Sequence, residues 1–136
     1  MQREPRADQA RQWLRHSAED LRAASHDLQA APPLVGDVLF HCQQAVEKAL
    51  KAFLAWHLQP FRRTHDLVEI GQLCVNVDAA LEPLLRRAAP LTGYAWQFRY
   101  PGEPAEPSNE EIEEALAVAR LAFEAIVERV PAEARP

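Results

Sequence analysis

One long amphipathic run, residues 35–54, limits what this chain can fold into more than any other feature of its sequence. At about 100° of rotation per residue, its apolar and polar side chains fall on opposite sides of a helix. The apolar set is Val35, Val38, Leu39, Cys42, Val46, Ala49, Leu50 and Phe53. The polar set is Asp37, His41, Gln44, Glu47, Lys48 and Lys51. An apolar side of this width is typical of a helix that faces the inside of a helical bundle.

The polar side of this helix has two interpretations, and the sequence leaves both open. It can be a solvated surface with pairs at i,i+4, such as Glu47 with Lys51, each contributing about 0.2–0.5 kcal/mol. It can equally be a contact surface for a partner chain or a phosphate group. In that case Gln44, Lys48 and Lys51 would supply the amide and ammonium donors.

Helical periodicity continues along most of the chain and predicts one domain, residues 6–130, with flexible tails at 1–5 and 131–136. The fold class we expect is all-α, an antiparallel up-and-down bundle of four long helices plus a short one. Thr64 is the expected N-cap of the short helix, and Pro90 and Gly93 predict a kink in the helix that follows. Ser108 opens a capping-box pattern before the last helix. The expected helices cover residues 6–30, 35–57, 65–75, 79–98 and 109–130.

Composition and charge exclude several classes of protein. The net charge of −5 argues against broad nonspecific binding of nucleic acid, which needs an excess of Lys and Arg. The apolar runs are far shorter than a membrane span, and residues 1–5 have no signal-peptide core, so we expect a cytoplasmic protein without membrane contact. Cys42 and Cys74 lie among apolar residues, which predicts two buried, reduced thiols. No metal-ligand spacing or glycine-rich phosphate loop is present, and we expect no cofactor.

Two short stretches carry residues that could perform chemistry. His65 beside Asp66 at a helix start could act as an acid or base, or could simply cap the helix and anchor the turn. Arg99 and Tyr100, at the end of an aromatic cluster, could hold a phosphate or a carboxylate. The alternative is that Arg99 clamps the following proline-rich loop onto the bundle.

Three blocks of the sequence resemble the HEPN (higher eukaryotes and prokaryotes nucleotide-binding) domain family. The first is Trp13-Leu14 with Asp20-Leu21, and the second is the run FHCQQAVEKALKA at residues 40–52 followed by THDL at residues 64–67. The third is Tyr94 with RYP at residues 99–101. The resemblance implies an all-α bundle that commonly forms a homodimer and associates with a small nucleotidyltransferase partner, often as a toxin–antitoxin pair.

Many members of the family are ribonucleases, with an Arg-x4–6-His motif completed across a dimer. In this sequence Arg99 is the arginine most like that of the motif, but no histidine follows it. Arg11 and His16 have the right spacing, but they lie in the first predicted helix.

We therefore expect a non-catalytic HEPN protein that dimerises and binds a nucleotidyltransferase partner, a nucleotide, or both. The alternatives are an RNA endonuclease using Arg99 and His65, and a helical interaction domain without a ligand. The residues expected at the binding site are Gln44, Lys48, Lys51, His65, Arg99 and Tyr100.

Overall fold

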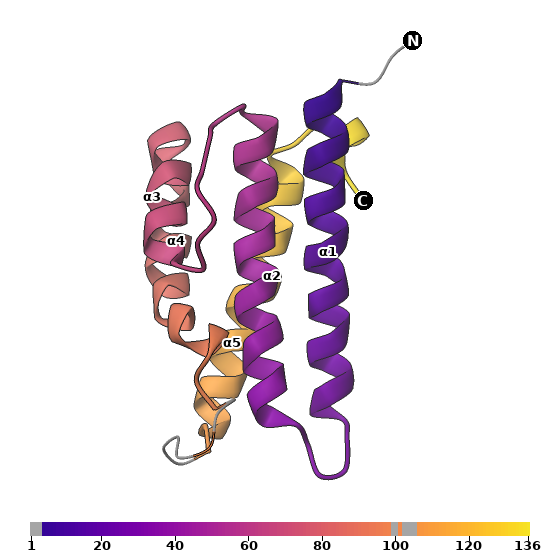
Figure 1. Cartoon of the computed structure of the whole chain (residues 1–136), viewed down its shortest axis with the longest axis vertical. Helices are drawn as coiled ribbons and strands as arrows, with labels where there is room; N and C mark the ends of the chain where they lie inside the picture. The colour runs from indigo at the N-terminus through magenta and orange to yellow at the C-terminus, as the bar shows by residue number, and fades with distance from the viewer. Residues whose placement is uncertain (1–3, 99–100, 102–105) are drawn as a thin grey trace.

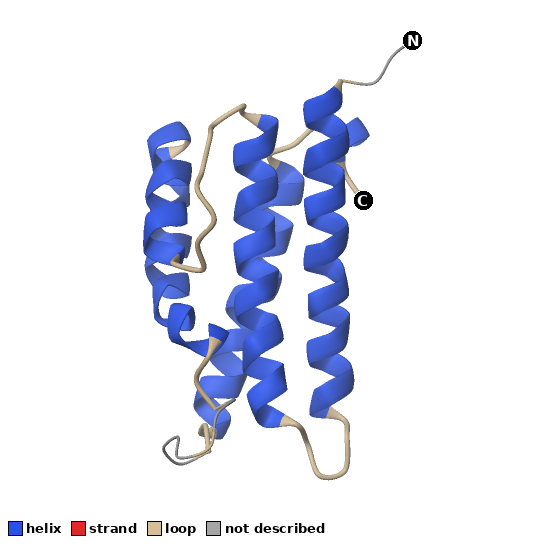
Figure 2. Ribbon diagram, viewed as in Figure 1, coloured by secondary structure: helices blue, strands red, loops and turns tan. Residues whose placement is uncertain are grey.

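The computed structural model describes residues 4–98, 101 and 106–136, and every regular element in these residues is helical (Figures 1 and 2). The all-α fold class is confirmed. Arg99 and Tyr100, two of the expected site residues, lie outside the described residues. The α-helices are α1 (Pro5–Leu28), α2 (Val35–Trp56), α3 (Leu67–Val77), α4 (Glu82–Ala88) and α5 (Asn109–Glu128). Three short 3₁₀ helices are η1 (Ala79–Leu81), η2 (Ala89–Ala95) and η3 (Ala132–Ala134).

Helix α2 is the centre of the molecule. Helix α1 runs antiparallel along one side of it, α5 lies behind it, and α3 and η2 pack on the other side (Figure 1). The loop between α2 and α3 returns along α2, so a further segment of chain lies against this helix. The largest fully buried side chains include Leu39, Leu50 and Phe53 of α2, with Leu14 of α1 and Ile126 of α5.

The position of α2 decides between the two interpretations of its polar side, and neither is right as stated. No residue of α2 is fully exposed, and Glu47 and Lys51, expected on the outer face, are only 3% and 7% exposed. Periodicity reports which residues share a side of a helix, but not whether another segment covers that side. The expected i,i+4 pair of Glu47 with Lys51 does form, inside the protein rather than on its surface.

The fourth expected helix is the largest departure from the predicted elements. Residues 79–98 form η1, α4 and η2 in succession instead of one long helix, so the bundle has three long helices and two shorter ones. Proline stands in the first turn of both α4 and η2, where its missing N–H costs nothing but a continuous helix cannot pass. The predicted interruption at Pro90 and Gly93 falls within η2.

Local side-chain caps fix the ends of the later helices. Asp66, rather than the expected Thr64, caps α3 by accepting from the Val68 N–H at 2.9 Å. The predicted capping box at the start of α5 is present, with Ser108 and Glu111 each accepting from the other's backbone N–H. Residues 131–136, expected to be a flexible tail, contain η3, which packs on α1 and buries Ala134.

Candidate functional site

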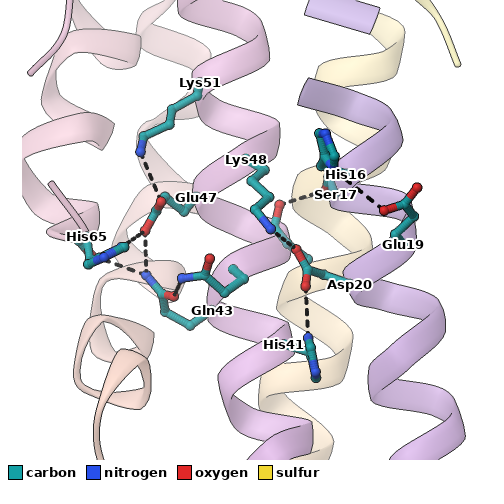
Figure 3. A network of polar contacts seen from close by, with 12 residues as sticks. His16, Ser17, Glu19, Asp20, His41, Gln43, Glu47, Lys48, Lys51 and His65 are labelled. Atoms are coloured by element: carbon teal, nitrogen blue, oxygen red, sulfur yellow. Dashed lines mark hydrogen bonds and ion pairs between the residues drawn. The ribbon is translucent and has the colours of Figure 1, made fainter. Parts of the chain in front are cut away.

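Polar side chains leave α2 on two sides and form two separate networks (Figure 3). Gln43, Glu47 and Lys51 point toward the loop that precedes α3, whereas His41 and Lys48 point toward α1. In the described part of the chain, no buried side-chain nitrogen or oxygen lacks a hydrogen-bond partner. The polar stripe of α2 is therefore used inside the domain, and it connects this helix to its neighbours on both sides.

The first network is built on the carboxylate of Glu47. Its Oε1 accepts from the Gln43 amide at 3.1 Å and lies 2.7 Å from Nδ1 of His65, while its Oε2 accepts from the Lys51 ammonium at 2.9 Å. Removing a carboxylate from water costs several kcal/mol unless charge and hydrogen bonds compensate it. Lys51 supplies the compensating charge, so Glu47 is ionised and can only accept hydrogen bonds.

His65 is held at the surface by this buried carboxylate. Its side chain is 63% exposed, and the Gln43 amide also donates to its backbone carbonyl at 3.2 Å. Because ionised Glu47 only accepts, Nδ1 of His65 must carry the proton of that hydrogen bond. The other ring nitrogen, Nε2, is then a lone-pair acceptor. The arrangement is an oriented imidazole of the kind that can serve as a base or a nucleophile.

Two aromatic rings close the other end of this network. Trp13 of α1 and Phe61 of the loop meet edge to face, with ring centroids 6.3 Å apart. The Lys51 ammonium lies 5.4 Å from the Trp13 ring centroid and 5.8 Å from that of Phe61. Both distances are within the range of cation–π attraction. Lys51 is thus a structural cation, not the free phosphate ligand that the sequence led us to expect.

The second network joins α2 to α1 through Asp20. The Lys48 ammonium donates to its Oδ2 at 2.6 Å, and Nδ1 of His41 lies 2.8 Å from its Oδ1. One turn toward the start of α1, the Ser17 hydroxyl donates to the Ala45 carbonyl at 2.7 Å. Lys48 remains half-buried, and two of its three ammonium protons are not committed to Asp20.

A groove beside Lys48 is the most ligand-like hollow near these networks. Its volume is about 450 Å³, within the usual range for small-molecule sites. Trp13 is half-buried in its wall, whereas the α1 side chains along its rim are exposed. Such a lining offers an aromatic face, amide groups and a cation within one hollow. The lining residues are Gln9, Gln12, Trp13, His16 and Lys48.

The thiols do not belong to any reactive site. Cys42 and Cys74 are free and buried, as predicted, and burial raises the pKa of each thiol to about 12. Tyr94 is likewise unsuited to donate a proton, because desolvation, followed by the Glu111 carboxylate, raises its pKa to about 12. The described residues contain no group of three or more side chains that could hold a metal ion.

The structure divides the expected site residues into separate places. His65 is exposed, Gln44 and Lys48 are half-buried, and Lys51 is internal, while Gln44 donates to Gln43 at 2.7 Å. Sequence reasoning missed Gln43 and Glu47 as the partners that hold His65. Their i,i+4 spacing with Lys51 was visible in the sequence, but the course of the loop that brings His65 to them was not.

The fold and these networks define a class: a small all-α bundle whose central helix carries a buried ion pair. The model of the HEPN domain matches residues 10–130. The chain therefore belongs to the HEPN domain family. Comparisons with curated protein sequences and with solved structures gave no match. In the described residues, no helix has the length and apolar character needed to cross a membrane.

Proposed function

We propose that this HEPN protein is a non-catalytic binding module that takes a nucleotide in the groove beside Trp13. We further propose that it acts as a homodimer with a small nucleotidyltransferase partner, as part of a toxin–antitoxin pair. The observation that carries the nucleotide proposal is the lining of the groove, in which one indole ring lies near one ammonium group.

Each side chain of the groove matches a part of a nucleotide. A base stacked on an aromatic side chain gains about 1–3 kcal/mol, so Trp13 is the natural platform for the base. The amides of Gln9 and Gln12 can donate to or accept from a base edge. The ammonium of Lys48, held in place by Asp20, can share its remaining protons with a phosphate group.

The non-catalytic part of the proposal is supported by the state of Arg11 and His16, the described pair with the spacing of the ribonuclease motif. The Arg11 guanidinium pairs with Asp8 and donates to the Glu133 carbonyl, which fixes η3 against α1. An arginine used in this way is not available to a scissile phosphate. His16 is exposed but belongs to the groove.

Titration calorimetry with ATP, ADP, AMP and inorganic phosphate tests the nucleotide site. We expect Trp13→Ala to weaken nucleotide binding roughly tenfold or more, because a stacking platform is lost. Trp96→Ala is the matched control, since Trp96 is also a large exposed aromatic residue but does not line the groove. Because Trp13 also packs on Phe61, Lys48→Gln provides a second variant that leaves this packing intact. Absence of binding to the wild-type protein would contradict the proposal.

Association with another chain is supported by an apolar groove between α3 and α4. Leu67, Gly71, Val75 and Leu85 line it, and Val68 at its edge is 60% exposed. Sedimentation velocity should show a concentration-dependent dimer in the wild-type protein. Val68→Glu should weaken this dimer, whereas Leu121→Glu on α5 should not. A monomer at all concentrations would remove the homodimer from the proposal.

An RNA endonuclease is the second candidate, favoured by one observation. The Glu47–His65 pair has the geometry of an oriented general base. If this candidate is right, purified protein cleaves tRNA, and His65→Ala abolishes cleavage while His16→Ala does not. Intact tRNA after incubation with the wild-type protein would leave the binding module as the remaining function.

A further inference from the structure

His65 combines high exposure with a rigid, charged support, and no other histidine of the chain does. His16 provides the comparison, because its side chain is 60% exposed and its Nδ1 also faces a carboxylate, that of Glu19. In that pair the two atoms are 3.5 Å apart and Glu19 is itself 71% exposed. For His65 the distance is 2.7 Å and the carboxylate of Glu47 is buried.

The support acts on the chemistry of the ring as well as on its position. With the proton fixed on Nδ1, the lone pair of Nε2 is directed away from Glu47. If Nε2 forms a bond to an electrophile, the ring gains positive charge. The hydrogen bond from Nδ1 to ionised Glu47 strengthens as that charge develops. The buried pair thus stabilises an Nε2-substituted imidazole more than a free one.

The surroundings of His65 favour an anionic electrophile. Arg62 and Arg63 precede it in the loop and are exposed, although Arg62 also pairs with Glu69. Helix α3 begins two residues later and presents the positive end of its dipole. The nearby Asp66 carboxylate is turned to the Val68 N–H of α3, and this contact partly neutralises it.

We propose that His65 is a phosphoryl-acceptor residue, modified at Nε2 by a donor that carries a phosphorus–nitrogen bond. The Nε2 lone pair attacks phosphorus, a new P–N bond forms, and the P–N bond of the donor breaks. The donor nitrogen leaves with that electron pair. No proton is lost from His65, because Nε2 carries none, and Glu47 balances the charge of the product ring. This role goes beyond the binding of a nucleotide and does not require the groove at Trp13.

Potassium phosphoramidate is a small P–N donor that tests the proposal on the wild-type protein. After incubation at neutral pH, mass spectrometry of the phosphorylated peptides gives a rate for each of the five histidines. We expect His65 to react on the order of tenfold faster than His16, since a charge-assisted hydrogen bond stabilises only its product well. ³¹P NMR should show the Nε2 isomer at His65. Equal rates for the two histidines, or an Nδ1 isomer at His65, would overturn the proposal.

Variants then separate the role of Glu47 from simple exposure. His65→Gln should remove the fast reaction and leave the slow one at His16. Glu47→Gln should slow His65 to the rate of His16, with circular dichroism confirming that the variant is folded. Because Glu47 is buried and this variant could lose its fold, the comparison of His65 with His16 in the wild-type protein decides the proposal without it. A folded Glu47→Gln variant that reacts at the wild-type rate would contradict the role given to the carboxylate.

Discussion

Glu47 shows how one buried charge can organise several parts of this protein. It receives hydrogen bonds from Gln43 and Lys51 on its own helix and from His65 on the loop. A buried ion pair is not by itself strong evidence of stability, because desolvation can exceed the attraction between the charges. Its clearer effect here is positional, since it fixes which way the His65 ring faces.

Glu47→Gln should destabilise the fold by about 3 kcal/mol, because Lys51 is left buried without its counter-charge. Urea denaturation measures this change. Glu69→Gln is the matched control: it removes an exposed partner of Arg62 and should cost less than about 1 kcal/mol. Adding Lys51→Met to Glu47→Gln should restore much of the loss, since no unpaired charge remains. Equal effects of Glu47→Gln and Glu69→Gln would argue against a buried pair.

The two thiols should be inert in the folded protein. Burial raises the pKa of Cys42 and Cys74 to about 12, so almost no thiolate is present near neutral pH. A disulfide reagent such as DTNB should react with neither thiol in buffer and with both in urea. Rapid reaction of one thiol in buffer would place that cysteine outside the core.

At the scale of elements, the short segments after α3 are held by contacts that join distant parts of the chain. Asp78 caps η1 by accepting from the Ala80 N–H at 3.0 Å, and it also accepts from Arg129 just after α5 at 2.9 Å. The Arg129 hydrogen bond, followed by that of Ala80, lowers the pKa of the Asp78 carboxyl below its usual 3.8. One carboxylate thus connects η1 to the end of α5.

This connection predicts a defined pH dependence. A carboxyl whose folded pKa is lowered stabilises the fold above the unfolded value of 3.8, and that stabilisation is lost as pH falls through the lower folded pKa. Arg129→Gln should therefore be less stable than wild type at neutral pH, with a difference that shrinks below about pH 4. Arg135→Gln loses a hydrogen bond to the Val130 carbonyl instead, and its stability difference should not change with pH in this way. Chemical denaturation at several pH values measures both differences.

The same elements show what sequence patterns can and cannot predict. The limits of α2 and the capping box at Ser108 were predictable, because both depend on residues close together in the chain. The division of residues 79–98 was only partly visible, since the proline that opens α4 was not recognised as a helix start. The site was predictable in its residue types but not in its connections. Glu47 and His65 are 18 residues apart, and their contact depends on the path of the loop.

At the scale of the whole molecule, α2 is surrounded and its polar residues act as internal links. One network ties the loop before α3 to α2, and the other ties α1 to α2 through Asp20 (Figure 3). The surfaces left for a ligand are consequently the groove beside Trp13 and the exposed imidazole of His65. The functions proposed above are assigned to these surfaces, and the interior polar residues serve to hold them in place.

The central claim is that buried Glu47 fixes the His65 ring with its proton on Nδ1. Nitrogen-15 NMR of the histidine side chains at neutral pH tests this most directly, because the two ring nitrogens differ in chemical shift when one carries the proton. We predict a single Nδ1–H tautomer for His65 and a mixture of tautomers for His16, whose carboxylate partner is exposed. An Nε2–H tautomer at His65, or the same mixture at both residues, would contradict the account.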